Sequence, residues 1–232
     1  MMTNSLRIVA ISDTHGGHAQ VKVPDADVLI HCGDFCKYGR MEEVKDFALW
    51  LQKLPHKHKL VTAGNHDKPV EAYPFKCRRL FEEAGVTLLL NEEIVIDGFK
   101  FWASPITPRF FDWSFMKDRG REITEVWAQI PEDVDVLITH GPPYGHGDLA
   151  PAYPPHQPLP KVAGCLDLLL RLREMKIKSG WKNPRVHCFG HIHSGAGVAH
   201  SDEFGRMLFV NAATCTEEYK PTNPPIEFTI NG

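Results

Sequence analysis

The sequence predicts a mixed α/β layered fold, and three observations support this prediction. Short apolar runs rich in β-branched residues recur along the chain, and several are apolar almost throughout, as expected of strands buried on both faces. Amphipathic patterns with helical spacing lie between some of these runs. The 232 residues are 43% hydrophobic and 24% charged, which fits one large globular core, so we expect a single domain over residues 1–232.

Nine of the apolar runs are predicted to be buried strands. In chain order they cover residues 6–12, 26–32, 58–64, 86–90, 93–97, 99–104, 135–140, 185–190 and 207–213. His31 and His187 lie inside two of these runs, and we expect both to be hydrogen-bonded histidines of the core.

Three segments are predicted to be helices, namely 41–53, 121–130 and 162–177. Two further segments are irregular: 104–120 gathers four aromatic residues between prolines, and 142–160 is rich in proline. Loops of this length in a compact domain are usually functional or disordered.

The charge and the cysteines limit the classes of function. The formal net charge of −3 and the pI of about 6.5 argue against general binding of nucleic acid or anionic membranes. The first residues lack a secretory signal, and no apolar run is long enough to span a bilayer. Six cysteines without a C-x-x-C pair indicate buried free thiols. We therefore expect a soluble, cytoplasmic protein.

Five of the predicted strands end in the same few polar residue types. Because ligands gather beyond the carboxyl ends of strands in α/β sheets, these ends predict one shared site. The five blocks are Asp13-Thr14-His15, Gly33-Asp34, Gly64-Asn65-His66-Asp67, His140-Gly141 and Gly190-His191-Ile192-His193.

The blocks supply seven candidate metal ligands: Asp13, His15, Asp34, Asn65, His140, His191 and His193. Seven ligands are too many for one four-coordinate ion. They suit two divalent or trivalent ions that share a bridging carboxylate and keep positions open for water and substrate. The alternative, ordinary polar residues at strand ends, explains any one of them but not the set.

The five blocks, in this order between residues 13 and 193, resemble the calcineurin-like metallophosphoesterases. The stretches SDTH, THGPP, NAATC and NPPIEF look most like the brain-type metallophosphoesterase-domain subfamily. The resemblance implies a sandwich of two mixed β-sheets flanked by helices, with a dinuclear metal site at the strand ends. It places Asp13, His15 and His193 on one metal. Asn65, His140 and His191 fall on the other metal, with Asp34 bridging.

The resemblance also implies the activity, a metal-dependent phosphoric ester hydrolase in which a metal-bridging hydroxide attacks phosphorus. Manganese, or iron with manganese, is the favoured metal pair, and zinc and magnesium stay open because the nitrogen and oxygen ligands do not choose among them. His66 is expected to contact the phosphate and assist the leaving group, with Asp67 orienting its ring. The alternative is a surface turn in which Asp67 caps the next helix.

The expected substrate is a small phosphodiester, nucleotide-derived or cyclic. The site blocks supply almost no lysine or arginine for a phosphomonoester dianion, whereas the 104–120 loop offers rings for stacking. The candidate substrate contacts are Asn65, His66, Arg109, Phe111 and Trp113. Two alternatives stay open: a phosphomonoesterase, and a nucleotide-binding protein with little turnover on the same scaffold. The sequence does not decide the oligomeric state.

Overall fold

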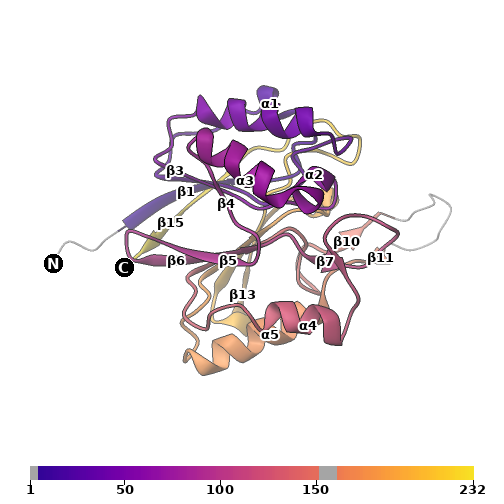
Figure 1. Cartoon of the computed structure of the whole chain (residues 1–232). Coiled ribbons are helices and arrows are strands. Elements are labelled where there is room, and N and C mark those ends of the chain that lie inside the picture. Colours follow the sequence, from indigo (N-terminus) through magenta and orange to yellow (C-terminus); the bar gives the residue numbers. More distant parts are fainter. Residues whose placement is uncertain (1–4, 152–160) are drawn as a thin grey trace.

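The structure, a computed structural model, describes residues 5–151 and 161–232 and has the predicted sandwich of two mixed β-sheets flanked by helices (Figure 1). Within the irregular 142–160 segment, residues 152–160 lie outside the described ranges. All nine predicted strands are present, most of them shorter by one to three residues at an end.

The first sheet has the strand order β15-β1-β2-β3-β4. Its members β1 to β4 are parallel to their neighbours, and the last strand of the chain, β15, is antiparallel to β1. The bounds are β1 Ser5–Ile11, β2 Val28–His31, β3 His58–Val61, β4 Thr87–Leu88 and β15 Ile226–Asn231.

The second sheet has the order β13-β14-β12-β9-β6-β5. Its four central strands are parallel, and the two edge strands are antiparallel to their neighbours. The bounds are β5 Glu92–Ile96, β6 Phe99–Ser104, β9 Val136–Thr139, β12 Val186–Phe189, β13 Gly197–Ser201 and β14 Met207–Asn211. Two short pairs lie outside both sheets: β7 Thr107–Pro108 with β8 Met116–Lys117, and β10 Leu149–Ala150 with β11 Lys161–Val162.

Helices cover the outer face of each sheet (Figure 1). Three lie over the first sheet: α1 Met41–Gln52, α2 Lys68–Ala72 and α3 Pro74–Glu83. Two lie over the second: α4 Arg121–Trp127 and α5 Leu166–Lys178. The sequence did not predict α2 or α3. It placed the start of α5 four residues early, because 161–162 pair as β11 and Cys165 then caps the helix by accepting the N–H of Leu168.

The apolar strands are explained by burial on both faces. In β1, Leu6, Ile8 and Ala10 pack between the sheets, while Val9 and Ile11 pack against the helix layer. Such a strand has no solvated face, so its sequence does not alternate. The cysteines are all buried and free, as predicted.

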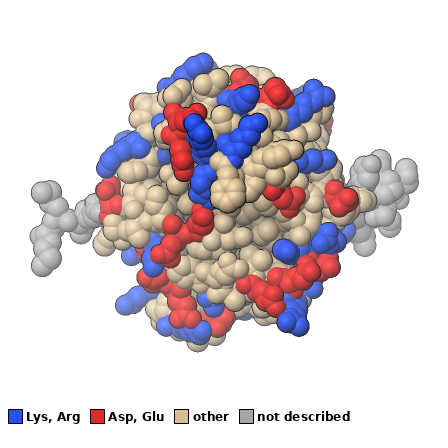
Figure 2. Space-filling model, viewed as in Figure 1, with Lys and Arg blue, Asp and Glu red and all other residues tan. Residues whose placement is uncertain are grey.

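Charges of both signs are mixed on the face of the molecule that Figure 2 shows. Figure 2 shows lysine and arginine interspersed with aspartate and glutamate, in line with the net charge of −3. None of the helices in the described ranges combines the length and hydropathy that crossing a bilayer requires.

The prediction of hydrogen-bonded core histidines is confirmed for His31 and only half correct for His187. His31 uses both ring nitrogens, with the Thr14 hydroxyl at 3.1 Å and the N–H of Gly33 at 3.2 Å. His187 Nε2 lies 2.8 Å from the Thr139 hydroxyl, and that hydroxyl donates to a carbonyl. His187 Nε2 therefore carries the proton, and its Nδ1 is a buried acceptor without a partner in residues 5–151 and 161–232.

Replacing His187 with Gln is expected to make stability less sensitive to acid. Burial lowers the pKa of His187 to about 3, below its ordinary 6.5. Between these values the unfolded chain binds a proton that the folded chain excludes. The free energy of unfolding therefore falls, as pH drops through this window, by about 1.4 kcal/mol per pH unit. Urea unfolding at several pH values should show a shallower slope for His187→Gln below about pH 6 and parallel profiles above pH 7. Equal acid slopes would contradict the assignment.

Candidate metal centre

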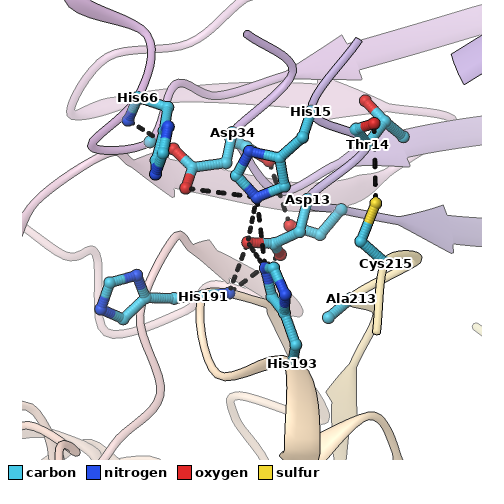
Figure 3. A network of polar contacts seen from close by, with 12 residues as sticks. Asp13, Thr14, His15, Asp34, His66, His191, His193, Ala213 and Cys215 are labelled. Carbon is cyan, nitrogen blue, oxygen red and sulfur yellow. Dashed lines mark hydrogen bonds and ion pairs between the residues drawn. The ribbon is translucent and has the colours of Figure 1, made fainter. Parts of the chain in front are cut away.

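The seven candidate ligands lie together where the two sheets end. Asp13, His15, Asp34 and Asn65 follow strands β1 to β3 of the first sheet, while the three other histidines follow β9 and β12 of the second. Backbone bonds join these loops, including Asp13 N–H to Gly33 O at 2.9 Å and Gly190 N–H to His140 O at 2.9 Å. Figure 3 shows the side chains of Asp13, His15, Asp34 and His193 pointing toward one another.

Four of these residues adopt left-handed backbone conformations that non-glycine residues seldom adopt. Their φ angles are 51° at Asp13, 42° at His15, 58° at Asp34 and 68° at His191. Each such residue costs about 1–3 kcal/mol, and surrounding contacts must hold it in place. The left-handed conformation turns the backbone sharply after the strand and directs the side chain toward the common centre.

Two glycines leave the space that the carboxylates occupy. A Cβ at Gly190 would lie 2.0 Å from Asp13 Oδ2, and one at Gly64 would lie 2.3 Å from Asp34 Oδ1. No side chain fits at either position without displacing a carboxylate. The glycines of the Gly64-Asn65 and Gly190-His191 blocks are therefore steric requirements of the centre.

Three of the imidazole rings are fixed by the same kind of hydrogen bond, from Nδ1–H to a backbone carbonyl. The Nδ1 atoms of His15, His140 and His193 each lie 3.0–3.2 Å from a backbone carbonyl, of Cys36, Cys32 and Thr216 respectively. A carbonyl can only accept, so Nδ1 carries the proton in each ring and donates it. In the neutral ring Nε2 then has a free lone pair, which is the form that binds metal ions.

The inward Nε2 atoms face other acceptors at short distance. His15 Nε2 lies 3.2 Å from His193 Nε2, and His193 Nε2 lies 3.4 Å from Asp13 Oδ1. On the other side His140 Nε2 lies 3.0 Å from Asn65 Oδ1 and 3.3 Å from Asp34 Oδ2. Lone pairs gathered in this way require protons or cations between them.

The pKa values of the histidines and carboxyls in the centre depend on one another. Burial disfavours imidazolium, but the charge of Asp34 outweighs it at His140, and the hydrogen bond and charge of Asp13 do so at His193. The pKa of each ring rises to about 9. Burial alone would raise the pKa of both carboxyls, yet His193 holds that of Asp13, and His140 that of Asp34, well below the ordinary range.

The donor set fits metal ions. Ligand atoms lie within 4.8 Å of one another in three buried or half-buried triads: Asp13-His15-His193, Asp34-His140-His191 and His15-Asp34-His66. Asp34 occurs in two of the triads, and its Oδ2 lies 3.9 Å from His15 Nε2 and 3.3 Å from His140 Nε2. The centre is thus consistent with two ions that share Asp34.

The expected role of Asp67 is corrected by its contacts. Its carboxylate is wholly buried and accepts three backbone N–H groups at 2.8 Å, those of Asp34, Cys36 and Gly64. Among the described residues no hydrogen bond joins it to the His66 ring, whose Nδ1 is bonded to Lys37 O, and its side chain makes no capping hydrogen bond to α2. Burial and the charge of Asp34 raise the pKa of Asp67 to about 8. Asp67 therefore fixes the loop that carries Asp34.

His66 lies at the edge of the centre. Its backbone N–H donates to Asp34 Oδ1 at 2.7 Å, and its ring Nδ1 donates to Lys37 O at 3.1 Å. The ring stacks on Trp113, with 4.5 Å between centroids, and meets His15 edge-on at 4.7 Å.

A cleft of about 580 Å³ opens over the centre. Of the expected substrate contacts, Asn65, His66, Phe111 and Trp113 line it. The structure does not bring Arg109 to the cleft lining: its Nε pairs with Asp118 at 2.5 Å. The aspartate nine residues further along the loop gives this arginine a local partner.

The structure adds Phe110 of the aromatic loop to the cleft wall, and also Glu217 and Tyr219 from a segment that the sequence did not mark. The two C-terminal residues are the less expected. They follow β14 in the stretch TEEYK, and no spacing motif marks them. Thr216, beside Glu217, supplies the carbonyl that holds His193, so the segment reaches the site through its backbone as well.

Comparisons with known proteins agree with this geometry. The sequence model of the family described as calcineurin-like phosphoesterase matches residues 6–195. The chain is 39% identical to metallophosphoesterase domain-containing protein 1 of Homo sapiens, over 95% of this chain and 69% of that protein. A UPF0046 protein of Caenorhabditis elegans is 35% identical over 98% and 76% of the two chains. The crystal structure of TT1561 of Thermus thermophilus has the same fold, with a TM-score of 0.52, 13% identity and coverage of 90% and 89%.

Substitution of Gly190 by Ala is expected to disrupt the centre. The new methyl group would overlap Asp13 Oδ2 and Ser12 Oγ, the latter at 2.2 Å. Overpacking of this kind costs about 1–3 kcal/mol, and displacing the carboxylate should lower the metal content as well. Elemental analysis and thermal unfolding measure the two effects.

Gly85→Ala is the matched control for this substitution. Gly85 has a φ of 70° and open space around its Cβ position. The control should therefore lose about 1 kcal/mol from backbone strain alone and keep its metal. A Gly190→Ala protein with unchanged metal content would show that the carboxylate position is not critical.

Proposed function

Because the chain belongs to the calcineurin-like phosphoesterase family, we propose that it is a metal-dependent hydrolase that binds two metal ions and prefers phosphodiesters to phosphomonoesters. The proposal rests on the position of Asp34. Its Oδ2 lies between His15 Nε2, in one triad of possible ligands, and His140 Nε2, in another. A single carboxylate placed between two sets of ligands is the arrangement that a pair of ions needs.

Two ligand sets are proposed, with the triads as support. Asp13, His15 and His193 would hold one ion. His140 and His191 would hold the other together with Asn65, whose Oδ1 lies 3.0 Å from His140 Nε2, and Asp34 would be shared. Manganese, or iron with manganese, is the proposed pair; zinc and magnesium accept the same nitrogen and oxygen donors. When bound, the ions neutralise charge on the phosphate oxygens and lower the pKa of a bound water.

The chain's own residues position the substrate and handle its proton. In hydrolysis a water oxygen bonds to phosphorus, the bond from phosphorus to the leaving oxygen breaks, and that oxygen takes up a proton. His66 is the proposed donor, because it lines the cleft outside the two ligand sets. Its Nδ1–H is held by Lys37 O, which leaves Nε2 as the nitrogen that exchanges the proton.

The walls of the cleft favour a diester. The described side chains that line it include Phe110, Phe111, Trp113 and Tyr219 but no lysine or arginine. A phosphomonoester dianion would find no lysine or arginine among these lining side chains, and Lys68 Nζ, 5.3 Å from the centroid of the Trp113 ring, lies outside the lining. A diester carries one charge less and a second organic group that can pack on the rings. Stacking on such rings is worth about 1–3 kcal/mol where the group is a base.

Replacing His66 with Asn should lower kcat by about a hundredfold or more while both metals stay bound. The Asn amide is able to keep the hydrogen bond to Lys37 O but offers no group in place of Nε2. Steady-state kinetics and elemental analysis of the same preparations test this. Loss of metal would make His66 a ligand, and activity near that of the wild type would leave it a structural residue.

The substrate preference is tested by kcat/KM on paired compounds with manganese-loaded protein of known metal content. We expect two ions per chain and higher efficiency on a bis-aryl phosphate than on the matching mono-aryl phosphate. The same order is expected for 2′,3′-cyclic nucleotides over nucleoside monophosphates. Higher efficiency on both monoesters would leave a phosphatase, and one ion per chain in a fully active sample would refute the dinuclear proposal.

A further inference from the structure

The C-terminal turn over residues 214–222 contributes Glu217 and Tyr219 to the wall of the cleft, and neither residue has a role in the proposed reaction. It is tied to the site at two points: Thr216 O accepts Nδ1–H of His193 at 3.0 Å, and Glu217 accepts the N–H of Ser194 at 2.7 Å. Within the turn, the N–H of Tyr219 donates to Thr216 O at 2.9 Å. The turn is therefore fixed relative to the metal centre.

Tyr219 occupies an unfavourable conformation in this turn. Its φ is 58°, where glycine or asparagine would fit without the penalty that a bulky residue meets. The conformation places the ring against the centre, 4.8 Å from His15 and 5.5 Å from His193, both edge-on. A strained residue held by its surroundings at a site suggests a function for its side chain.

Tyr219 is 47% exposed and lines the cleft, and its hydroxyl has no hydrogen-bond partner among the described residues, so this donor is available to a ligand in the cleft. Outside the proposed metal ligands, the side chains lining the cleft that can donate a hydrogen bond are His66, Trp113 and Tyr219. Of these three, only Tyr219 contacts both His15 and His193. A tyrosine hydroxyl, with an ordinary pKa of about 10, is a neutral donor at pH 7.

We infer that the Tyr219 hydroxyl donates a hydrogen bond to a non-bridging phosphate oxygen of the substrate, on the Asp13-His15-His193 side of the cleft. The inference rests on the proposed function for its substrate class. In a cleft wall without lysine or arginine, such a donor orients the phosphoryl group while adding no charge. It thereby supports the preference for the singly charged diester.

The test is the affinity of the manganese-loaded protein for inorganic phosphate, measured by calorimetry, together with kcat/KM on the bis-aryl phosphate. Tyr219→Phe keeps the ring against His15 and His193 and removes only the donor. Loss of a hydrogen bond to a charged group should weaken phosphate binding and lower kcat/KM by about 10- to 100-fold, with metal content and Tm unchanged. Tyr73→Phe is the matched control, because Tyr73 is 61% exposed and lies outside the cleft lining.

Tyr219→Leu separates the hydroxyl from the ring. If Tyr219→Phe equals the wild type in both measurements while Tyr219→Leu is impaired, the ring only packs and the inference is overturned. If the wild-type protein turns over no phosphoester but Tyr219→Phe still weakens phosphate binding, the inference stands and the proposed function fails. Unchanged phosphate affinity in Tyr219→Phe overturns the inference whether or not the protein is active.

Discussion

The structure depends on one constraint, the donation of three imidazole Nδ1–H groups to backbone carbonyls. These bonds turn the Nε2 lone pairs of His15, His140 and His193 inward, toward two buried carboxylates. Without cations, the acceptors are satisfied by protons, which is why the pKa values of His140 and His193 rise to about 9. Two of the carbonyls, of Cys32 and Cys36, come from the loop after β2 of the first sheet, and the third comes from the C-terminal turn after β14 of the second sheet, so both sheets set the geometry of the centre.

The surrounding backbone holds the carboxylates and imidazoles of the centre close together although like groups repel one another there. Gly64 and Gly190 leave room for carboxylate oxygens, and four left-handed residues aim side chains that an extended strand would point elsewhere. Asp67 ties the loop of Asp34 to that of Gly64 through three backbone N–H groups, although its own burial beside Asp34 raises its pKa. These backbone donors stabilise the buried Asp67 carboxylate, as a buried polar group requires.

The sequence was informative wherever a residue directly follows a strand. Parallel strands bring their carboxyl ends together, so the seven candidate ligands could be grouped before the structure was known. It was not informative where position depends on tertiary contacts: Arg109 is paired by Asp118, Asp67 reaches backbone that no motif marks, and Tyr219 arrives with the C-terminal turn. Helix α3 was missed because only Cys77 and Phe81 of its residues are buried, too few for a visible stripe.

In the cleft, the ionisable groups and the aromatic rings lie in different places, and this arrangement connects metal binding with substrate binding. Its base carries carboxylates and imidazoles, and its walls carry rings, Glu217 and no lysine or arginine among the described residues. The chain as a whole has a net charge of −3, and its surface charges are mixed (Figure 2). The net charge and the side chains that line the cleft therefore offer little attraction for a phosphate anion. Under the proposed function the ions would supply that positive charge, so we expect metal occupancy to govern the binding of a phosphoester as well as its hydrolysis.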